Sequence, residues 1–326
     1  MGPGDLSAVL NGLKLYRPEK LLVGFETGDD AAVLDIGESG YLVQTVDFIT
    51  PVVDDAYTFG RISALNSMSD VYAMGGVPVS ALSVFSYSCS VDKDDIRAMM
   101  QGAGDEFAAV NCSLCGGHTV DDAEIKLGFS VTGIIKDKKF YRNVGLRQGD
   151  LMIYTKKLGI GLITTAIKAG LCNDEYAAEV IKTMTLSNKN AAGILRQFDV
   201  SACTDVTGFG LAGHGNEMAS GSGVTVEFFT DKIHIQNGAK EFASQFIIPA
   251  GAYSNMEFVK DQCVFEQTSD NSHMVLFDPQ TSGGLLIGVA EKDAEAMVRV
   301  LKSVGYEDTD IIGRVTEKSD FSVIFN

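Results

Sequence analysis

Five aspartates are the residues of this chain whose positions could do chemistry together. Asp29 and Asp30 stand side by side before a predicted strand, and Asp47 ends the next predicted strand. Asp70 lies in a predicted helix, and Asp205 lies in the second half of the chain. Any one of these acids is more often a helix cap or turn residue than a ligand. Carboxylates that share one site, however, repel each other and raise each other's pKa unless cations lie between them.

The chemistry that suits such a cluster is the binding of Mg²⁺ together with phosphate. Mg²⁺ prefers oxygen ligands and shares its coordination with water and substrate phosphates. The chain has no G-x-x-x-x-G-K-[ST] phosphate loop, no G-x-S-x-G nucleophile motif and no H-E-x-x-H zinc motif. Acids, Mg²⁺ and backbone N–H groups are another way to hold a polyphosphate. Asn66, four residues before Asp70, faces the same side of its helix.

Two glycine-containing strings are open to two interpretations. Gly116 and Gly117 precede His118 after a strand-like segment, and Asp278-Pro-Gln-Thr-Ser-Gly-Gly precedes an apolar strand. Paired glycines let a backbone approach a ligand closely, but a plain turn needs them as well. His118 and His214 are each as consistent with a structural histidine as with a ligand.

A third string, Gly208-Phe-Gly-Leu-Ala-Gly, matches the dinucleotide-binding fingerprint G-x-G-x-x-G. That fingerprint needs a hydrophobic strand immediately before the first glycine. Residues 201–207 are short and polar, and an ionised Asp205 would repel a pyrophosphate. We therefore do not expect a dinucleotide site here.

The six cysteines do not indicate a disulfide framework or a zinc site. Cys112 and Cys115 form a lone C-x-x-C pair with no second pair and no histidine pair at zinc spacing. They end an apolar segment, so we expect small buried thiols. No signal peptide, lipidation motif or apolar run of about 18 residues is present, and we expect a cytoplasmic protein without a membrane partner.

Composition excludes several classes of protein. The chain has 326 residues, of which 45% are hydrophobic and 21% charged, which excludes a disordered chain and suits two domains. The net charge of −17 makes a nucleic-acid partner unexpected, because such proteins need a basic surface.

Hydrophobic periodicity predicts strands and helices in both halves, which indicates an α/β or α+β fold. The basic, polar stretch at 136–149 is the best boundary, and we expect domains at 1–140 and 141–326. Strands are expected at 31–36, 41–46, 79–87, 126–135, 151–155, 224–229, 285–289 and 322–325. Helices are expected at 5–13, 57–74, 94–110, 161–169, 175–183, 188–198, 209–219 and 293–304.

Eight strings together resemble the selenophosphate synthetases (selenide, water dikinases). They lie in order along nearly the whole chain, at 26–33, 45–48, 59–62, 66–76, 116–118, 158–161, 204–211 and 278–285. Thr204-Asp-Val-Thr-Gly-Phe-Gly and Asp278-Pro-Gln-Thr-Ser-Gly-Gly are the most specific of them. The resemblance implies an α+β protein with the two-domain fold of aminoimidazole ribonucleotide synthetases, in which the N-terminal sheets pair in a homodimer.

The resemblance also implies an activity and the residues of its site. The family converts ATP, selenide and water into selenophosphate, orthophosphate and AMP with several Mg²⁺ ions, and holds ATP at the dimer interface. By position, Asp30, Asp70 and Asp205 match metal ligands. The ATP-binding residues that it implies are Thr27, Gly28, Asp29, Asp47 and Asp70, with Gly116, Gly117 and His118 reaching the partner's nucleotide site.

One departure concerns catalysis. The family carries a cysteine or selenocysteine, followed three residues later by a lysine, in an N-terminal segment that has no counterpart after Met1. We therefore assign no catalytic residue in this chain and expect a truncated protein with impaired turnover. The alternative function is that of an ATP-binding ligase or kinase of the same fold that acts on another acceptor and releases ADP.

Overall fold

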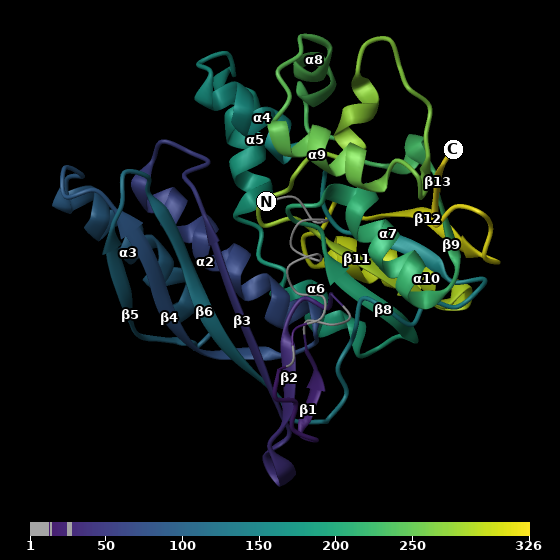
Figure 1. Cartoon of the computed structure of the whole chain (residues 1–326), viewed down its shortest axis with the longest axis horizontal. Helices are drawn as coiled ribbons and strands as arrows, with labels where there is room; N and C mark the ends of the chain where they lie inside the picture. The colour runs from purple at the N-terminus through teal and green to yellow at the C-terminus, as the bar shows by residue number, and fades with distance from the viewer. Residues whose placement is uncertain (1–12, 14, 25–27) are drawn as a thin grey trace.

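Each half of the protein is built on its own β-sheet (Figure 1). The computed structural model describes residues 13, 15–24 and 28–326. Both sheets carry helices packed against them, so the α+β class expected from the sequence is confirmed. The helix expected at 5–13 lies, apart from Leu13, outside the described residues.

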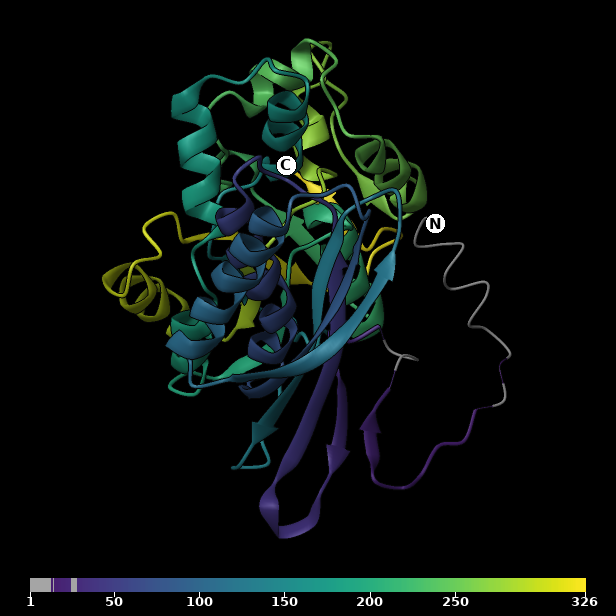
Figure 2. The same cartoon turned by 90° about the vertical axis from the view of Figure 1, so that its left-hand side faces the viewer.

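The first half holds a six-stranded sheet with the order β1-β2-β3-β6-β4-β5. Figure 2 shows its long strands passing alongside the helices α2 and α3. Its elements are β1 (Leu21–Val23), β2 (Ala32–Asp35), β3 (Tyr41–Ile49), α2 (Ala56–Ala73), β4 (Val77–Tyr87), α3 (Lys93–Ala109), β5 (Ser113–Asp121) and β6 (Lys126–Ile135).

In the part of the chain that the structure describes, helices cover one face of this sheet and leave the other face open. Along β4, Ala81 and Phe85 are buried in the core, whereas Leu82 and Val84 point outward and are exposed. The expectation of a buried strand at 79–87 was therefore wrong in its burial, because this strand alternates between core and surface. On β5, which is the edge strand, nearly every residue is exposed.

The second half holds a seven-stranded sheet with the order β10-β13-β9-β12-β7-β11-β8. Its strands are β7 (Leu151–Tyr154), β8 (Val200–Asp205), β9 (Thr225–Phe228), β10 (Cys263–Val264), β11 (Leu285–Val289), β12 (Asp310–Thr316) and β13 (Val323–Phe325). Its helices are α4 (Ile160–Lys168), α5 (Asp174–Met184), α6 (Lys189–Leu195), α7 (Gly210–Ser222), α8 (Ala239–Ser244), α9 (Ala250–Val259) and α10 (Glu291–Ser303).

Helix α2 lies between the two halves. It begins where the Asp55 carboxylate accepts a hydrogen bond from the Thr58 N–H at 2.8 Å, and Gly75, at φ +78°, follows its last turn. Every residue from 62 to 69 is buried, which is more than two turns and so includes all sides of the helix. A helix buried on all sides must be packed on all sides, and α2 contacts β3 and β6 as well as β8 and α6.

Several sequence expectations need correction. The stretch at 201–207 was judged too short and polar for the strand of a dinucleotide fingerprint, but 200–205 form the buried strand β8. Gly116 and Gly117 lie within strand β5 rather than in a turn. Cys112 is buried as expected, but Cys115 is exposed because it lies on that edge strand. Strands β5 and β12 and helices α8 and α9 were not anticipated.

The G-x-G-x-x-G string does not form a dinucleotide site. It follows β8 and enters α7, but among the described strands β8 pairs only with β11, in antiparallel fashion, whereas the fingerprint belongs to a parallel βαβ unit. Gly210, at φ +67°, is explained by packing, because a Cβ there would lie 2.8 Å from the backbone of Phe277. Among the described residues, no helix is long and apolar enough to cross a membrane.

We predict that two neighbouring glycines of α3 respond in opposite ways to alanine. A Cβ at Gly102 would lie 2.1 Å from the Tyr57 carbonyl oxygen of α2, so Gly102→Ala should lower the free energy of unfolding by about 1–3 kcal/mol. Gly104 has nothing within 4 Å of its Cβ position, so Gly104→Ala should be neutral or stabilising. Denaturant unfolding measures both, and equal effects would contradict the close packing of α2 on α3.

Candidate active site

Four carboxylates from both halves face each other at the junction where α2 lies. Asp30 precedes β2, Asp47 lies on β3, Asp70 on α2, and Asp205 ends β8. The charge of Asp205 raises the pKa of each of the other three, which shows that the second half supplies the carboxylate common to the cluster. We call these four residues the acid cluster.

Short hydrogen bonds hold the acid cluster in place. The Thr204 hydroxyl of β8 donates to Asp30 Oδ1 at 2.6 Å and so joins the two halves directly. The Thr45 hydroxyl donates to Asp70 Oδ2 at 2.5 Å, and the Asn66 side-chain amide donates to Asp47 Oδ2. The sequence interpretation that placed these acids in one site is consistent with this arrangement.

Burial is the main cause of the unusual electrostatics of the cluster. It raises the pKa of Asp47 to about 6, and it raises the pKa of Asp30 and of Asp70 well above the ordinary value. Burial also raises the pKa of Asp205, although a hydrogen bond with Ser69 acts in the opposite direction. Burial and repulsion between like charges therefore both disfavour the ionised form of these carboxylates when no cation is bound.

The residues present fit a divalent cation. Asp30 Oδ2 and Asp205 Oδ2 are buried and accept no hydrogen bond from the described residues. Unpartnered carboxylate oxygens are the donors that a hard cation such as Mg²⁺ prefers. Within the described part of the chain, no three His, Cys, Asp or Glu side chains form a metal site by themselves. A Mg²⁺ ion here would therefore need further oxygen ligands, which phosphate groups and water supply.

The buried residue Lys156 lies close enough to the acid cluster for the charge of Asp205 to affect its pKa. Lys156 follows β7 and is 2% exposed, and its Nζ donates a hydrogen bond to the Ser282 carbonyl oxygen at 2.7 Å. Burial lowers the pKa of Lys156 to about 7, and the charge of Asp205 acts in the opposite direction. Sequence reasoning missed this residue, although a lysine directly after an apolar strand was a signal that could have found it.

The loop at 278–284, which the sequence left open as a turn or a segment that approaches a ligand, holds the junction together from the second half. The Ser282 N–H donates to Asn66 Oδ1 at 2.7 Å, and the Asn188 amide donates to both Ser69 Oγ and the Gly283 carbonyl at 2.8 Å. Asp278 is fully buried, and burial raises its pKa to about 7. Asn66 thus contacts both the acid cluster and this loop.

Other predicted site residues are placed differently. The Asp29 carboxylate accepts hydrogen bonds from Arg142 Nε at 3.2 Å and from the Asn143 N–H at 3.0 Å, so it fastens the segment between the sheets. Gly28 is exposed at φ +63° beside it, and Thr27 lies outside the described residues.

The structure does not bring Gly116, Gly117 and His118 to the acid cluster of their own chain. They lie on β5, and strands β4 and β6 separate β5 from β3, which carries Asp47. Three inter-strand spacings amount to about 14 Å. His214, in contrast, is a structural histidine, because its Nε2 accepts the Thr207 N–H at 3.1 Å.

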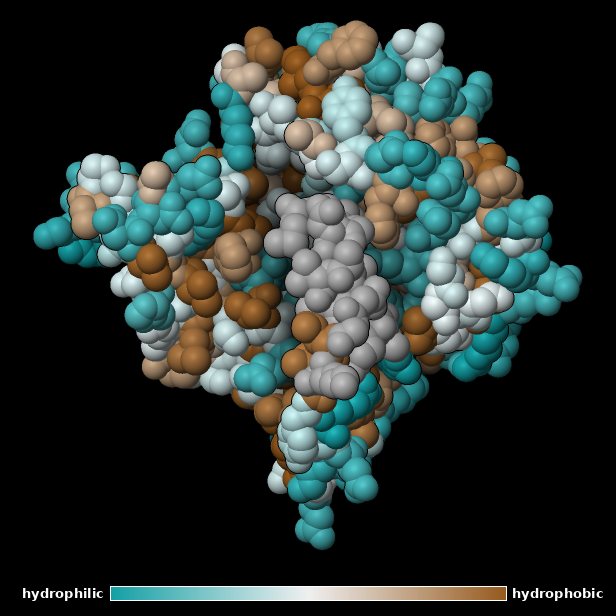
Figure 3. Space-filling model, in the orientation of Figure 1, coloured by the Kyte–Doolittle hydropathy of each residue, from teal (hydrophilic) through white to brown (hydrophobic). Residues whose placement is uncertain are grey.

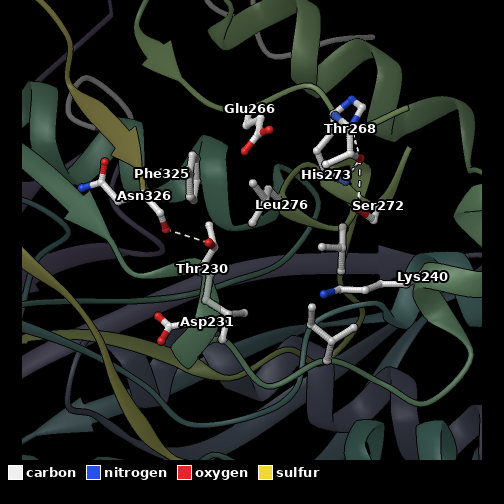
Figure 4. Close-up of a pocket in the computed structure, with 13 residues that line it drawn as sticks. Thr230, Asp231, Lys240, Glu266, Thr268, Ser272, His273, Leu276, Phe325 and Asn326 are labelled. Carbon is white, nitrogen blue, oxygen red and sulfur yellow. Dashed lines mark hydrogen bonds between the residues drawn. The ribbon is translucent and has the colours of Figure 1, made fainter. Parts of the chain in front are cut away.

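A pocket of about 400 Å³ in the second half is separate from this site (Figure 4). Its lining includes Lys240, Glu266, His273 and Phe325 and none of the acid-cluster residues. Its charged groups are of both signs and stand on the surface, so it does not share the chemistry of the cluster.

Two family descriptions match the chain, one for each half. Residues 28–135 match "AIR synthase related protein, N-terminal domain", and residues 147–326 match "AIR synthase related protein, C-terminal domain". The selenide, water dikinase of Caldanaerobacter subterraneus subsp. tengcongensis is 44% identical over 99% of this chain and 94% of its own. The selenide, water dikinase 2 of Peptoclostridium acidaminophilum is 44% identical over 99% of this chain and 93% of its own.

Solved structures share the fold at much lower identity. The thiamine monophosphate kinase of Aquifex aeolicus is 17% identical, with a TM-score of 0.67 over 91% of both chains. The hydrogenase maturation protein HypE in complex with ATP is 18% identical, with a TM-score of 0.67 over 91% of this chain and 84% of that one. These likenesses confirm the expected two-domain fold.

We predict that Asp205→Asn stabilises the protein in the absence of metal and nucleotide. A carboxylate whose pKa is raised by folding stabilises the fold at low pH and loses that contribution as pH rises through its folded pKa. The wild-type melting temperature should therefore fall as the pH rises from about 4, the ordinary pKa of an aspartate, through about 6, the pKa of Asp47. The melting temperature of the variant should fall less over this pH range, because the charge of Asp205, which raises the pKa of the other three carboxylates, is gone.

The same variant should bind Mg²⁺-nucleotide about tenfold more weakly or worse. Thermal unfolding with and without Mg²⁺ and ATP measures both effects. Asp320→Asn, on the exposed surface, is the control and should change neither. A variant with the wild-type pH dependence and the wild-type stabilisation by nucleotide would contradict the role of Asp205.

Proposed function

This chain belongs to the selenide, water dikinase family, and we propose that it converts ATP, selenide and water into selenophosphate, orthophosphate and AMP. The observation that carries the proposal is the acid cluster, in which buried, unpartnered carboxylate oxygens of Asp30 and Asp205 meet at the junction of the two halves. A site that transfers phosphoryl groups from ATP has to neutralise a triphosphate. Preorganised carboxylates with cations meet that need.

The proposed metal ligands are Asp30, Asp70 and Asp205, and the proposed cofactor is Mg²⁺ in several ions bound with ATP. When bound, Mg²⁺ neutralises phosphate charge. Side chains of the protein determine where the cation would lie, because they orient the carboxylates that would bind it. Thr204 and Thr45 orient the carboxylates of Asp30 and Asp70 by hydrogen bonds of 2.6 and 2.5 Å.

The proposed nucleotide-site residues are Thr27, Gly28, Asp29, Asp47 and Asp70. Asn66 supports this set, because it donates to the carboxylate of Asp47. Asp29 also contributes, because its carboxylate accepts hydrogen bonds from Arg142 and Asn143 and so holds the segment that leads from the first sheet to the second.

A homodimer through the first sheet completes the proposal. The uncovered face of that sheet carries Val46, Phe48, Leu82, Val84 and Val120, each between 39% and 59% exposed. Figure 3 shows hydrophobic residues gathered on the side where Figure 1 places this sheet. Large exposed apolar patches mark protein–protein contacts.

The dimer would also give Gly116, Gly117 and His118 a role. These residues are exposed on the edge strand β5, away from the acid cluster of their own chain, and we propose that they reach the partner's nucleotide. The proposed domains are 1–140, for ATP binding and dimerisation, and 141–326. A cytoplasmic location and selenide as substrate stay predictions.

The product assay tests the function. With ATP and selenide, the chain, or the chain extended by a Cys-x-x-Lys segment ahead of Gly2, should form AMP and selenophosphate. Asp70→Asn should lower the rate by about 100-fold or more, because one preorganised charge at the phosphates is lost. Asp320→Asn should leave the rate unchanged. Formation of ADP alone by both forms would overturn the proposal in favour of a ligase or kinase with another acceptor.

We predict that Leu82→Asp converts a dimer into a monomer, because it places a carboxylate on the apolar face of the first sheet. Light scattering at micromolar concentration measures the mass. Phe246→Asp is the matched control: Phe246 is 73% exposed in the second half, so this variant should remain dimeric. A wild-type monomer at this concentration would contradict the dimer.

A further inference from the structure

Three consecutive residues at the end of β7 form hydrogen bonds with the loop at 278–284 and with Leu285 directly after it. The Tyr154 hydroxyl accepts the Gly284 N–H at 3.2 Å, and Thr155 Oγ1 accepts the Leu285 N–H at 2.8 Å. Lys156 Nζ donates to the Ser282 carbonyl oxygen at 2.7 Å. A Cβ at Gly284 would lie 2.8 Å from the Lys156 backbone nitrogen, so the loop packs directly on this lysine.

Ser282 is held in a strained backbone conformation. Its φ is +50°, in the left-handed region that residues other than glycine rarely adopt. Such a residue destabilises the fold and persists only where its surroundings fix it. Here both ends of the residue are held, the N–H by Asn66 Oδ1 at 2.7 Å and the carbonyl oxygen by Lys156.

The strained residue is connected to the acid cluster by hydrogen bonds through the side chain of Asn66. Asn66 accepts the Ser282 N–H with its oxygen and donates to the Asp47 carboxylate with its nitrogen. Asn66 is 3% exposed, so water does not replace either bond easily. A change at Ser282 therefore shifts Asn66, and with it the orientation of Asp47.

The charge of Lys156 needs an explanation as well. A buried ammonium is destabilising unless opposite charge compensates it. Asp205 provides such charge, since it favours the protonated form of Lys156. The lysine thus lies between the loop that it holds and the acid cluster that stabilises its charge.

We propose that Lys156 is a positioning residue of the nucleotide site, which holds Ser282 so that Asn66 keeps Asp47 in the orientation for Mg²⁺-nucleotide binding. Lys156 acts through Ser282 and Asn66 rather than by touching the nucleotide. The inference rests on the proposed function for the identity of the ligand, but not for the identity of the products.

The test is a double-mutant cycle on the affinity for a non-hydrolysable ATP analogue with Mg²⁺, measured by calorimetry. Lys156→Met should weaken binding about tenfold, and Asn66→Ala should do the same. Because Lys156 and Asn66 both act through Ser282, the double variant should have about the same affinity as the weaker-binding single variant. Independent effects would instead make its affinity about 100-fold lower than that of the wild type. Lys156→Gln, which keeps an N–H donor, should recover most of the affinity.

Lys157→Met is the matched control. Lys157 is the next residue, and it pairs with Glu179 at 2.6 Å, outside the loop contact, so its loss should leave the affinity unchanged. Thermal unfolding accompanies each titration. If Lys156→Met does not fold, the double-mutant cycle is measured with Lys156→Gln and Asn66→Ala instead. The loss of affinity from Lys156→Gln should be smaller, and the two losses must again be non-additive.

Two results would overturn the inference. One is a folded Lys156→Met variant that loses thermal stability but binds the analogue like the wild type, which is the outcome of a purely structural role. The other is independent effects of Lys156 and Asn66 in the double variant. A wild-type protein that binds the analogue and makes only ADP would refute the proposed products while leaving this cycle intact.

Discussion

The repulsion among four carboxylates, of which Asp205 is buried and the other three are half-buried, is the constraint on which the rest of the structure depends. Asp30, Asp47 and Asp70 come from the first half, and Asp205 raises the pKa of all three from the second. No single element could hold them at one place, so both sheets must be fixed against each other. The cost of bringing them together is offset when cations bind, which makes the empty site less stable than the loaded one.

The fold meets this constraint through the helix between the sheets. The buried stretch of α2 at 62–69 contains Asn66 and Ser69, which hydrogen-bond with the loop at 278–284 and with Asn188. Thr204 reaches Asp30 across the same junction. Because these bonds cross between the halves, the relative position of the sheets and the orientation of the carboxylates are set by the same contacts.

The sequence predicted the acids and most of the elements, because spacing and periodicity are local signals. It did not predict strand β8, in which the buried apolar residues at 200, 202 and 203 are interrupted by the polar residues Ser201, Thr204 and Asp205. It placed Cys115 inside because an apolar segment was taken as buried, whereas an edge strand leaves it exposed. Lys156 and Ser282 were missed, since their role depends on a contact between residues more than 120 positions apart.

When Mg²⁺-nucleotide binds, the carboxylates of the acid cluster should give up protons. Calorimetry at about pH 6.5 in two buffers of different ionisation enthalpy measures that release, and Asp205→Asn provides the comparison in which the nucleotide's own protons are the same. Because burial raises the pKa of Asp47 to about 6 and raises the pKa of Asp30 and of Asp70 well above the ordinary value, the wild type should release more protons than the variant. Equal proton release by the wild type and the variant would contradict the account.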